Sequence, residues 1–114
     1  MDYLSFNTIM ESTLAEADIE IPEWGGTVQV RALTGAEIAR AKRKATNPRT
    51  KDLDEIQFNA LLMVAGCIEP AFPPASEEQL MRTIAAGPVA RIAARIIELS
   101  GLGDQDEDDD QGEA

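Results

Sequence analysis

The most constraining feature of this sequence is a segment that predicts a β-hairpin running directly into a capped helix. Apolar and polar residues alternate on both sides of Gly25 and Gly26, as in two half-buried strands joined by a tight turn. A two-residue turn at these glycines would place Ile21 opposite Val30 on one face of the hairpin. Because Pro22 has no N–H for a ladder hydrogen bond, we expect its strand to lie at a sheet edge or to be bulged.

The helix that follows the hairpin has a clear start signal. Thr34 and Glu37 have the spacing of a capping box, in which each side chain bonds to the backbone N–H of the other residue. Leu33 and Ile38 stand where a hydrophobic staple would fix the corner between strand and helix. We therefore expect a helix over residues 34–46.

Four other segments combine helix-start residues with apolar residues at helical spacing. Helices are expected over residues 8–16 capped by Asn7, after a capping box at Asp52 and Glu55, after another at Ser76 and Gln79, and from Pro88 to Gly101. The helix after Asp52 is the most apolar, which predicts that it forms the centre of the core. The predicted fold class is α+β and mainly helical, with an N-terminal β-hairpin followed by a bundle of about four helices.

The charge distribution divides the chain into two parts. The net charge is −11, but seven of the 21 acidic residues and none of the ten basic residues lie in residues 104–114. The rest of the chain carries 14 acids and ten bases, a net charge of −4. A like-charge segment that cannot bury apolar surface is expected to be disordered. We therefore predict a single domain over residues 1–103 and a disordered acidic tail over 104–114.

The composition argues against an enzyme. The chain contains no histidine, which removes the commonest general base and the commonest zinc ligand. Asp52, Asp54 and Glu55 are clustered, but acids are favoured at a helix start for structural reasons. The glycines match no phosphate-binding loop, and Cys67 lies among apolar residues typical of a buried, inert thiol. We expect no catalytic residue, cofactor or metal.

The N-terminal and apolar segments bear on localisation. Asp2 and Glu11 occupy the region where a signal peptide would carry basic residues. No apolar run approaches the ~20 residues needed to span a bilayer. The sequence therefore predicts a soluble intracellular protein that does not bind membranes.

Two features are candidates for binding a partner. One is the basic run, which could contact nucleic-acid phosphates but is also common on solvated helix faces. It consists of Arg40, Lys42, Arg43, Lys44, Arg49 and Lys51. The other is Trp24, either an exposed binding anchor or a plug folded over the core. We expect Trp24 to act with apolar residues of the last helix that the core leaves uncovered. These candidates are Val89, Ile92, Ile96 and Leu102.

Three segments together resemble a known family. They are residues 21–37, which include Gly25, Gly26, Thr34 and Glu37, residues 67–74, and residues 95–102. In these segments the sequence resembles the tail assembly chaperones of long-tailed bacteriophages and prophages. The shared motifs are structural and cover most of residues 17–102. The acidic ending departs from the short mixed ending that is frequent in the family.

The resemblance implies a non-enzymatic chaperone that binds and solubilises the tape measure protein in the host cytoplasm and is absent from the mature virion. It further implies self-association into oligomers, contact with the tail tube protein, and a frameshifted longer form whose switch would fall near the acidic tail. Two other functions remain open. One is a small DNA-binding regulator that uses the basic helix at 34–46, and the other is a structural tail completion protein.

Overall fold

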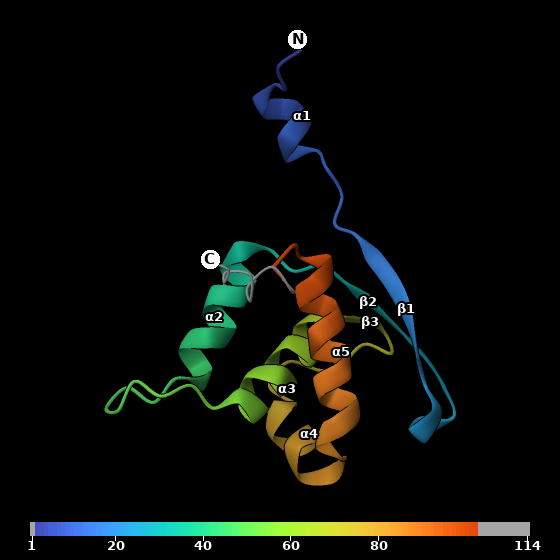
Figure 1. Cartoon of the computed structure of the whole chain (residues 1–114), viewed down its shortest axis with the longest axis vertical. Coiled ribbons are helices and arrows are strands. Elements are labelled where there is room, and N and C mark those ends of the chain that lie inside the picture. The colour runs from blue at the N-terminus through green and yellow to red at the C-terminus, as the bar shows by residue number, and fades with distance from the viewer. Residues whose placement is uncertain (1, 103–114) are drawn as a thin grey trace, which may run out of the picture.

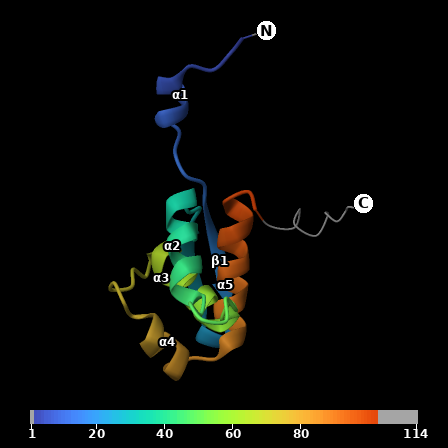
Figure 2. The ribbon, with the colours of Figure 1, turned by 90° about the vertical axis from the view of Figure 1, so that its left-hand side faces the viewer.

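The computed structural model describes residues 2–102, and shows helices packed against a small antiparallel sheet (Figures 1 and 2). The predicted class, an α+β fold dominated by helix, is confirmed. The acidic segment 104–114 lies outside the described residues. The elements are α1 (Phe6–Met10), β1 (Glu16–Ile21), a 3-10 turn (Pro22–Trp24), β2 (Gly26–Arg31), α2 (Gly35–Ala45), α3 (Glu55–Gly66), β3 (Cys67–Glu69), α4 (Glu77–Thr83) and α5 (Ala86–Leu99).

The hairpin forms with a longer turn than the sequence predicted. Residues Pro22–Trp24 make a 3-10 turn and Gly25 takes the left-handed φ of +71°, whereas Gly26 already belongs to β2. Ile21 consequently pairs with Gly26, and the predicted pairing with Val30 is wrong. The reason is that proline cannot donate to the ladder and its fixed φ suits the start of a turn. The shift preserves which side chains share a face, because Ile21 and Val30 are both buried on the same side.

The sheet has the order β1-β2-β3, so β1 is an edge strand, as Pro22 led us to expect. The third strand was not predicted. Residues Cys67–Glu69 follow α3 without a loop, and the apolar Ile68 continued the helical pattern in the sequence. Pairing with β2, at Val30↔Cys67 and Gln29↔Glu69, gives this short segment its extended form.

Both ends of the helical region close as predicted. The Glu37 N–H donates to Thr34 Oγ1 at 3.2 Å and the Thr34 N–H donates to Glu37 Oε1 at 2.9 Å, which completes the capping box of α2. At the end of α5, Gly101 has a φ of +85° and the Leu102 N–H donates to the Ile97 carbonyl at 3.1 Å. This is the left-handed helix ending that favours glycine.

Two predicted helix starts are wrong. The N-terminal helix is Phe6–Met10, capped by Ser5 rather than Asn7, and Glu16 belongs to β1 instead. The cap of α3 is Asp54, not Asp52. Asp52 is held before the helix because its carbonyl accepts the Asn47 N–H at 2.8 Å.

The predicted capping box of α4 is also wrong. Ser76 precedes this helix with a ψ of 3°, not the extended conformation of a capping residue, and its side chain makes no capping bond. The Ser76 hydroxyl is buried and has no hydrogen-bond partner among the described residues.

The core lies where α3 and α5 cross and pack on one face of the sheet. Its fully buried large side chains are Ile21, Val30, Leu62, Met63, Ile92 and Ile96. The prediction that the helix after residue 52 is central is confirmed, since α3 contacts α2, α4 and α5. Gly66 permits the close approach of α3 to α5, because a Cβ there would lie 2.5 Å from Ile96 Cδ1.

Candidate protein-binding surfaces

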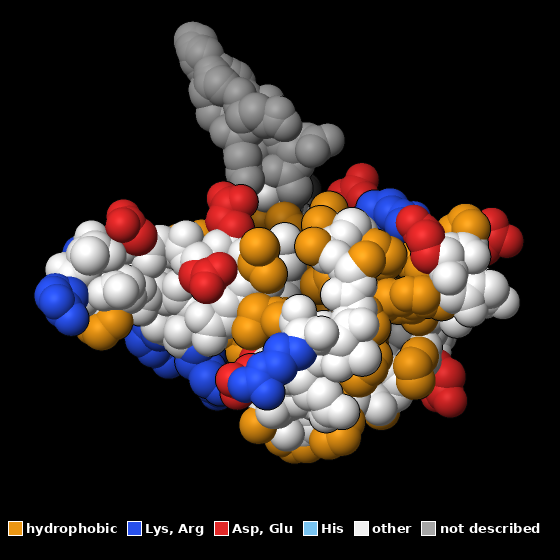
Figure 3. Space-filling model, turned by 90° about the horizontal axis from the view of Figure 1, so that it is seen from below, with side chains coloured by type: hydrophobic (Ala, Val, Ile, Leu, Met, Phe, Trp, Pro, Cys, Tyr) orange, Lys and Arg blue, Asp and Glu red, His pale blue; other side chains and the backbone are white. Residues whose placement is uncertain are grey.

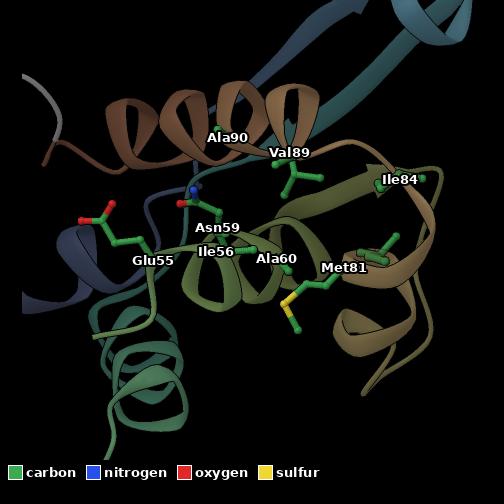
Figure 4. A pocket seen from close by; sticks show the side chains of 10 residues that line it. Glu55, Ile56, Asn59, Ala60, Met81, Ile84, Val89 and Ala90 are labelled. Atoms are coloured by element: carbon green, nitrogen blue, oxygen red, sulfur yellow. The ribbon is translucent and has the colours of Figure 1, made fainter. Parts of the chain in front are cut away.

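An apolar groove runs between α3, α4 and α5, and we call it the α3/α4/α5 groove (Figure 4). Its volume is about 280 Å³. Aliphatic side chains line most of it, while Glu55 and Asn59 lie together at one end (Figure 4). The apolar lining residues are Ile56, Ala60, Leu80, Met81, Ile84, Ala86, Val89 and Ala90.

The residues of this groove suit it to an apolar helix. Ala60 and Val89 are buried, whereas Ile56 is 59% exposed. Ala86 and Ala90 lie one turn apart on α5 and are exposed, so only small side chains separate an incoming helix from the α5 backbone. Such grooves bind amphipathic helices through side chains at helical spacing. Viewed from the α4 end, hydrophobic side chains gather at the centre of the surface, with charged side chains around them (Figure 3).

A second groove, the α2/α3 groove, lies where α2 and α3 meet the loop before α4. Leu61, Val64 and Phe72 supply apolar lining, and Arg40 and Lys44 supply positive charge. Phe72 is partly buried against the core. The basic residues of α2 therefore fall into two groups, those that line this groove and those that do not. Arg40 and Lys44 line this groove, and Lys44 also lies 3.7 Å from the Glu77 carboxylate.

Thr34 and Glu37 act structurally: both form the capping box of α2, and Glu37 also forms an ion pair with Arg31 that ties three elements together. Arg31 on β2 donates two hydrogen bonds to the Glu37 carboxylate, at 2.8 and 3.1 Å, and a third to the Ala65 carbonyl of α3 at 3.1 Å. The bond from Arg31, with help from the Thr34 N–H, lowers the pKa of Glu37 to about 2. Glu37 is thus a fixed anion, unsuited to proton transfer near neutral pH.

Trp24 lies at the tip of the hairpin and is 40% exposed. The interpretation of Trp24 as a core plug is therefore wrong. The neighbouring Glu23 forms an ion pair with Arg91, which joins the hairpin tip to α5.

The last helix presents fewer apolar residues than expected. Val89, Ile92 and Ile96 are 6%, 0% and 0% exposed, so the expectation that the core leaves them uncovered is wrong. The apolar stripe of α5 packs on α3 and on the sheet, and those side chains are buried in this contact. Leu102 is 47% exposed, but it follows the C-terminal end of α5, whereas Glu23, the neighbour of Trp24, pairs with Arg91 in the N-terminal half of that helix.

The sequence interpretation missed the N-terminal arm, which we define as residues 2–15. The arm projects beyond the helices and the sheet (Figures 1 and 2), and its short helix buries no residue. Its exposed large apolar residues are Tyr3, Leu4, Phe6, Ile9, Met10 and Leu14. The signal was present in the sequence, since these six lie within twelve positions that contain only one charged residue.

Within residues 2–102 there is no cluster of three or more potential metal ligands. No helix in the same range is long and apolar enough to cross a membrane.

The fold has a counterpart among solved structures. The tail assembly chaperone of bacteriophage HK97 superposes with a TM-score of 0.58, over 75% of this chain and 85% of that chain, at 17% sequence identity. This chain shares the fold of that chaperone. No protein-family model and no curated protein matches the sequence. The similarity therefore rests on three-dimensional arrangement alone.

Proposed function

We propose that this protein is a non-enzymatic phage tail assembly chaperone that binds and solubilises the tape measure protein through the α3/α4/α5 groove. The observation that carries the proposal is an open apolar groove on a fold shared with the HK97 tail assembly chaperone. On this proposal the protein acts in the host cytoplasm and leaves before the virion is complete.

The groove supplies the chemistry that such a client needs. A long helical protein that awaits its tube exposes apolar stripes, and exposed stripes of this kind aggregate. Ile56, Met81 and Ile84 offer apolar contacts to one face of a client helix. The flexible thioether of Met81 adapts to different side chains, which suits a chaperone that binds repeated and imperfect helical segments.

Co-expression with the tape measure protein of the same phage or prophage tests the proposal. Ala90→Glu places a charge in the groove from an exposed helical position, so it should abolish co-purification without unfolding the chaperone. Ala39→Glu makes the same change at an exposed position of α2 that lines neither groove, and it should leave binding intact. Equal binding by both variants, or a tape measure protein that stays insoluble with the unaltered chain, would contradict the proposal.

A further inference from the structure

We propose that the acidic segment of this chain, residues 104–114, binds the basic run in the same molecule and keeps nucleic acid away from it. The basic run is six exposed residues, and residues 38–51, in which it lies, contain no acid. Its members are Arg40, Lys42, Arg43 and Lys44 on α2, and Arg49 and Lys51 in the segment after it. Residues 104–114 contain seven acids and no base.

The basic run carries the unpaired positive charge of residues 2–102. Every basic residue outside the run forms an ion pair with a carboxylate, and these residues are Arg31, Arg82, Arg91 and Arg95. Within the run, Lys44 alone has such a partner among residues 2–102, and it lies 3.7 Å from Glu77. The spacing of Arg40, Arg43 and Lys44 brings these three side chains together on α2. Such a cluster attracts a segment of negative charge.

The end of α5 brings the acidic segment close to the start of α2. The Leu33 N–H donates to Ser100 Oγ at 2.9 Å, and the two helix ends lie at the same end of the helical body (Figures 1 and 2). Arg40 to Lys44 lie about 9–15 Å further along α2, from the helical rise per residue. Residues 103–110 can span up to ~26 Å. The acids can therefore reach the basic run of their own chain.

Tethering favours this contact over one with a separate molecule. A short connection holds two partners at an effective concentration of ~1 mM. A segment that binds with a Kd of ~0.1 mM would then occupy the run about nine-tenths of the time. The segment has one apolar residue, Ala114, so it matches the charges of the run and not the apolar lining of either groove.

The bound segment would change what the basic run can do. Exposed Lys and Arg side chains bind nucleic-acid phosphates without regard to sequence. The hypothesis of a DNA-binding regulator depended on these same side chains of α2. Carboxylates of the same chain compete with phosphates for them, so the segment gives the chain a built-in block against nucleic acid.

Paramagnetic relaxation in the full chain tests where the segment binds. A nitroxide attached at Gln111→Cys labels the segment selectively, because Cys67 is 8% exposed. The backbone amide signals of residues 40–51 should broaden, and added salt should reduce the broadening. Changing Asp108, Asp109 and Asp110 to Asn keeps the length of the segment and should remove the preference for residues 40–51.

Charge reversal identifies the acceptor. Arg40→Glu with Arg43→Glu should abolish the broadening of residues 40–51. Arg82→Glu with Arg95→Glu makes the same change in net charge at exposed sites outside the run, and it should leave the broadening intact. Circular dichroism of each variant checks that the helices still fold.

Fluorescence anisotropy with a short labelled duplex DNA at low salt measures the block. The variant with Asn at positions 108, 109 and 110 should bind DNA about tenfold or more tightly than the unaltered chain. Adding Arg40→Glu with Arg43→Glu should remove this gain, whereas adding Arg82→Glu with Arg95→Glu should not.

Three results would overturn the inference. The first is broadening that is the same with the neutralised segment. The second is broadening in a mixed sample where one molecule carries the nitroxide and another the isotope label, which would show that the segment binds a separate copy. The third is a gain in DNA binding that is absent or that both charge-reversal pairs remove equally. None of these measurements involves the tape measure protein, so they are independent of the proposed function.

Discussion

Replacing Glu37 by Gln tests the ion pair that joins β2, α2 and α3. Lowering the pKa of Glu37 from 4.5 to about 2 corresponds to ~3 kcal/mol of stability at neutral pH. Both side chains are partly exposed, at 28% for Arg31 and 25% for Glu37, so solvent screening reduces our expectation to ~2 kcal/mol. Glutamine keeps an oxygen that can accept the Thr34 N–H, but its amide nitrogen cannot accept the second bond from Arg31, so the substitution removes the charge and that bond together.

The lowered pKa of Glu37 also predicts how its contribution to stability changes with pH. A carboxylate with a depressed pKa stabilises the folded state above its unfolded pKa, and this stabilisation is lost as pH falls through the folded pKa. The difference in unfolding free energy between wild type and Glu37→Gln should be largest at neutral pH and should shrink between pH ~5 and pH ~2. Urea denaturation followed by circular dichroism at several pH values measures it.

The exposed pair of Arg95 and Glu98 provides the control. Their side chains are 42% and 59% exposed, so Glu98→Gln should cost no more than ~0.5 kcal/mol at any pH. A Glu37→Gln destabilisation that is independent of pH, or no larger than that of Glu98→Gln, would refute the reasoning. The acidic tail does not confound the comparison, because its titration is common to all the proteins compared.

Two further predictions concern the core. Gly66→Ala should destabilise the fold by ~1–3 kcal/mol, because the new Cβ would lie 2.5 Å from Ile96 Cδ1. Gly35→Ala should not destabilise the fold, because its Cβ would meet no atom within 4 Å. The urea midpoints of the two variants measure the difference in stability. Burial raises the pKa of the Cys67 thiol to about 11, so it should react with a thiol reagent slowly in the native protein and rapidly in urea. A fast reaction of Cys67 in the native protein would contradict this prediction, because it would show that the structure around the thiol opens.

The hairpin and the capped helix were predictable because their signals are local. Strand alternation has a period of two, so the buried face of the hairpin was correct even though the register was wrong. The register depends on where the turn begins, and Pro22 decided that by forming the turn itself. The Thr34 and Glu37 capping box needs only four consecutive residues, and it formed as predicted.

The third strand and the binding surfaces were not predictable in the same way. Cys67–Glu69 becomes a strand only because β2 lies beside it, which is a long-range condition. The apolar stripe of α5 predicted a buried face but not how much of it the core would cover. The structure covers Val89, Ile92 and Ile96, and leaves open the smaller Ala86 and Ala90. Small residues carry little signal in a sequence, yet here they shape the α3/α4/α5 groove.

The most direct test of the central claim is site-specific photo-crosslinking between this protein and the tape measure protein. A photoreactive residue at position 90, in the α3/α4/α5 groove, is predicted to crosslink to a helical segment of the tape measure protein, whereas the same residue at position 39 on α2 is not. Crosslinks from position 39 alone, or none from position 90 in a complex that co-purifies, would show that the client is held by another surface.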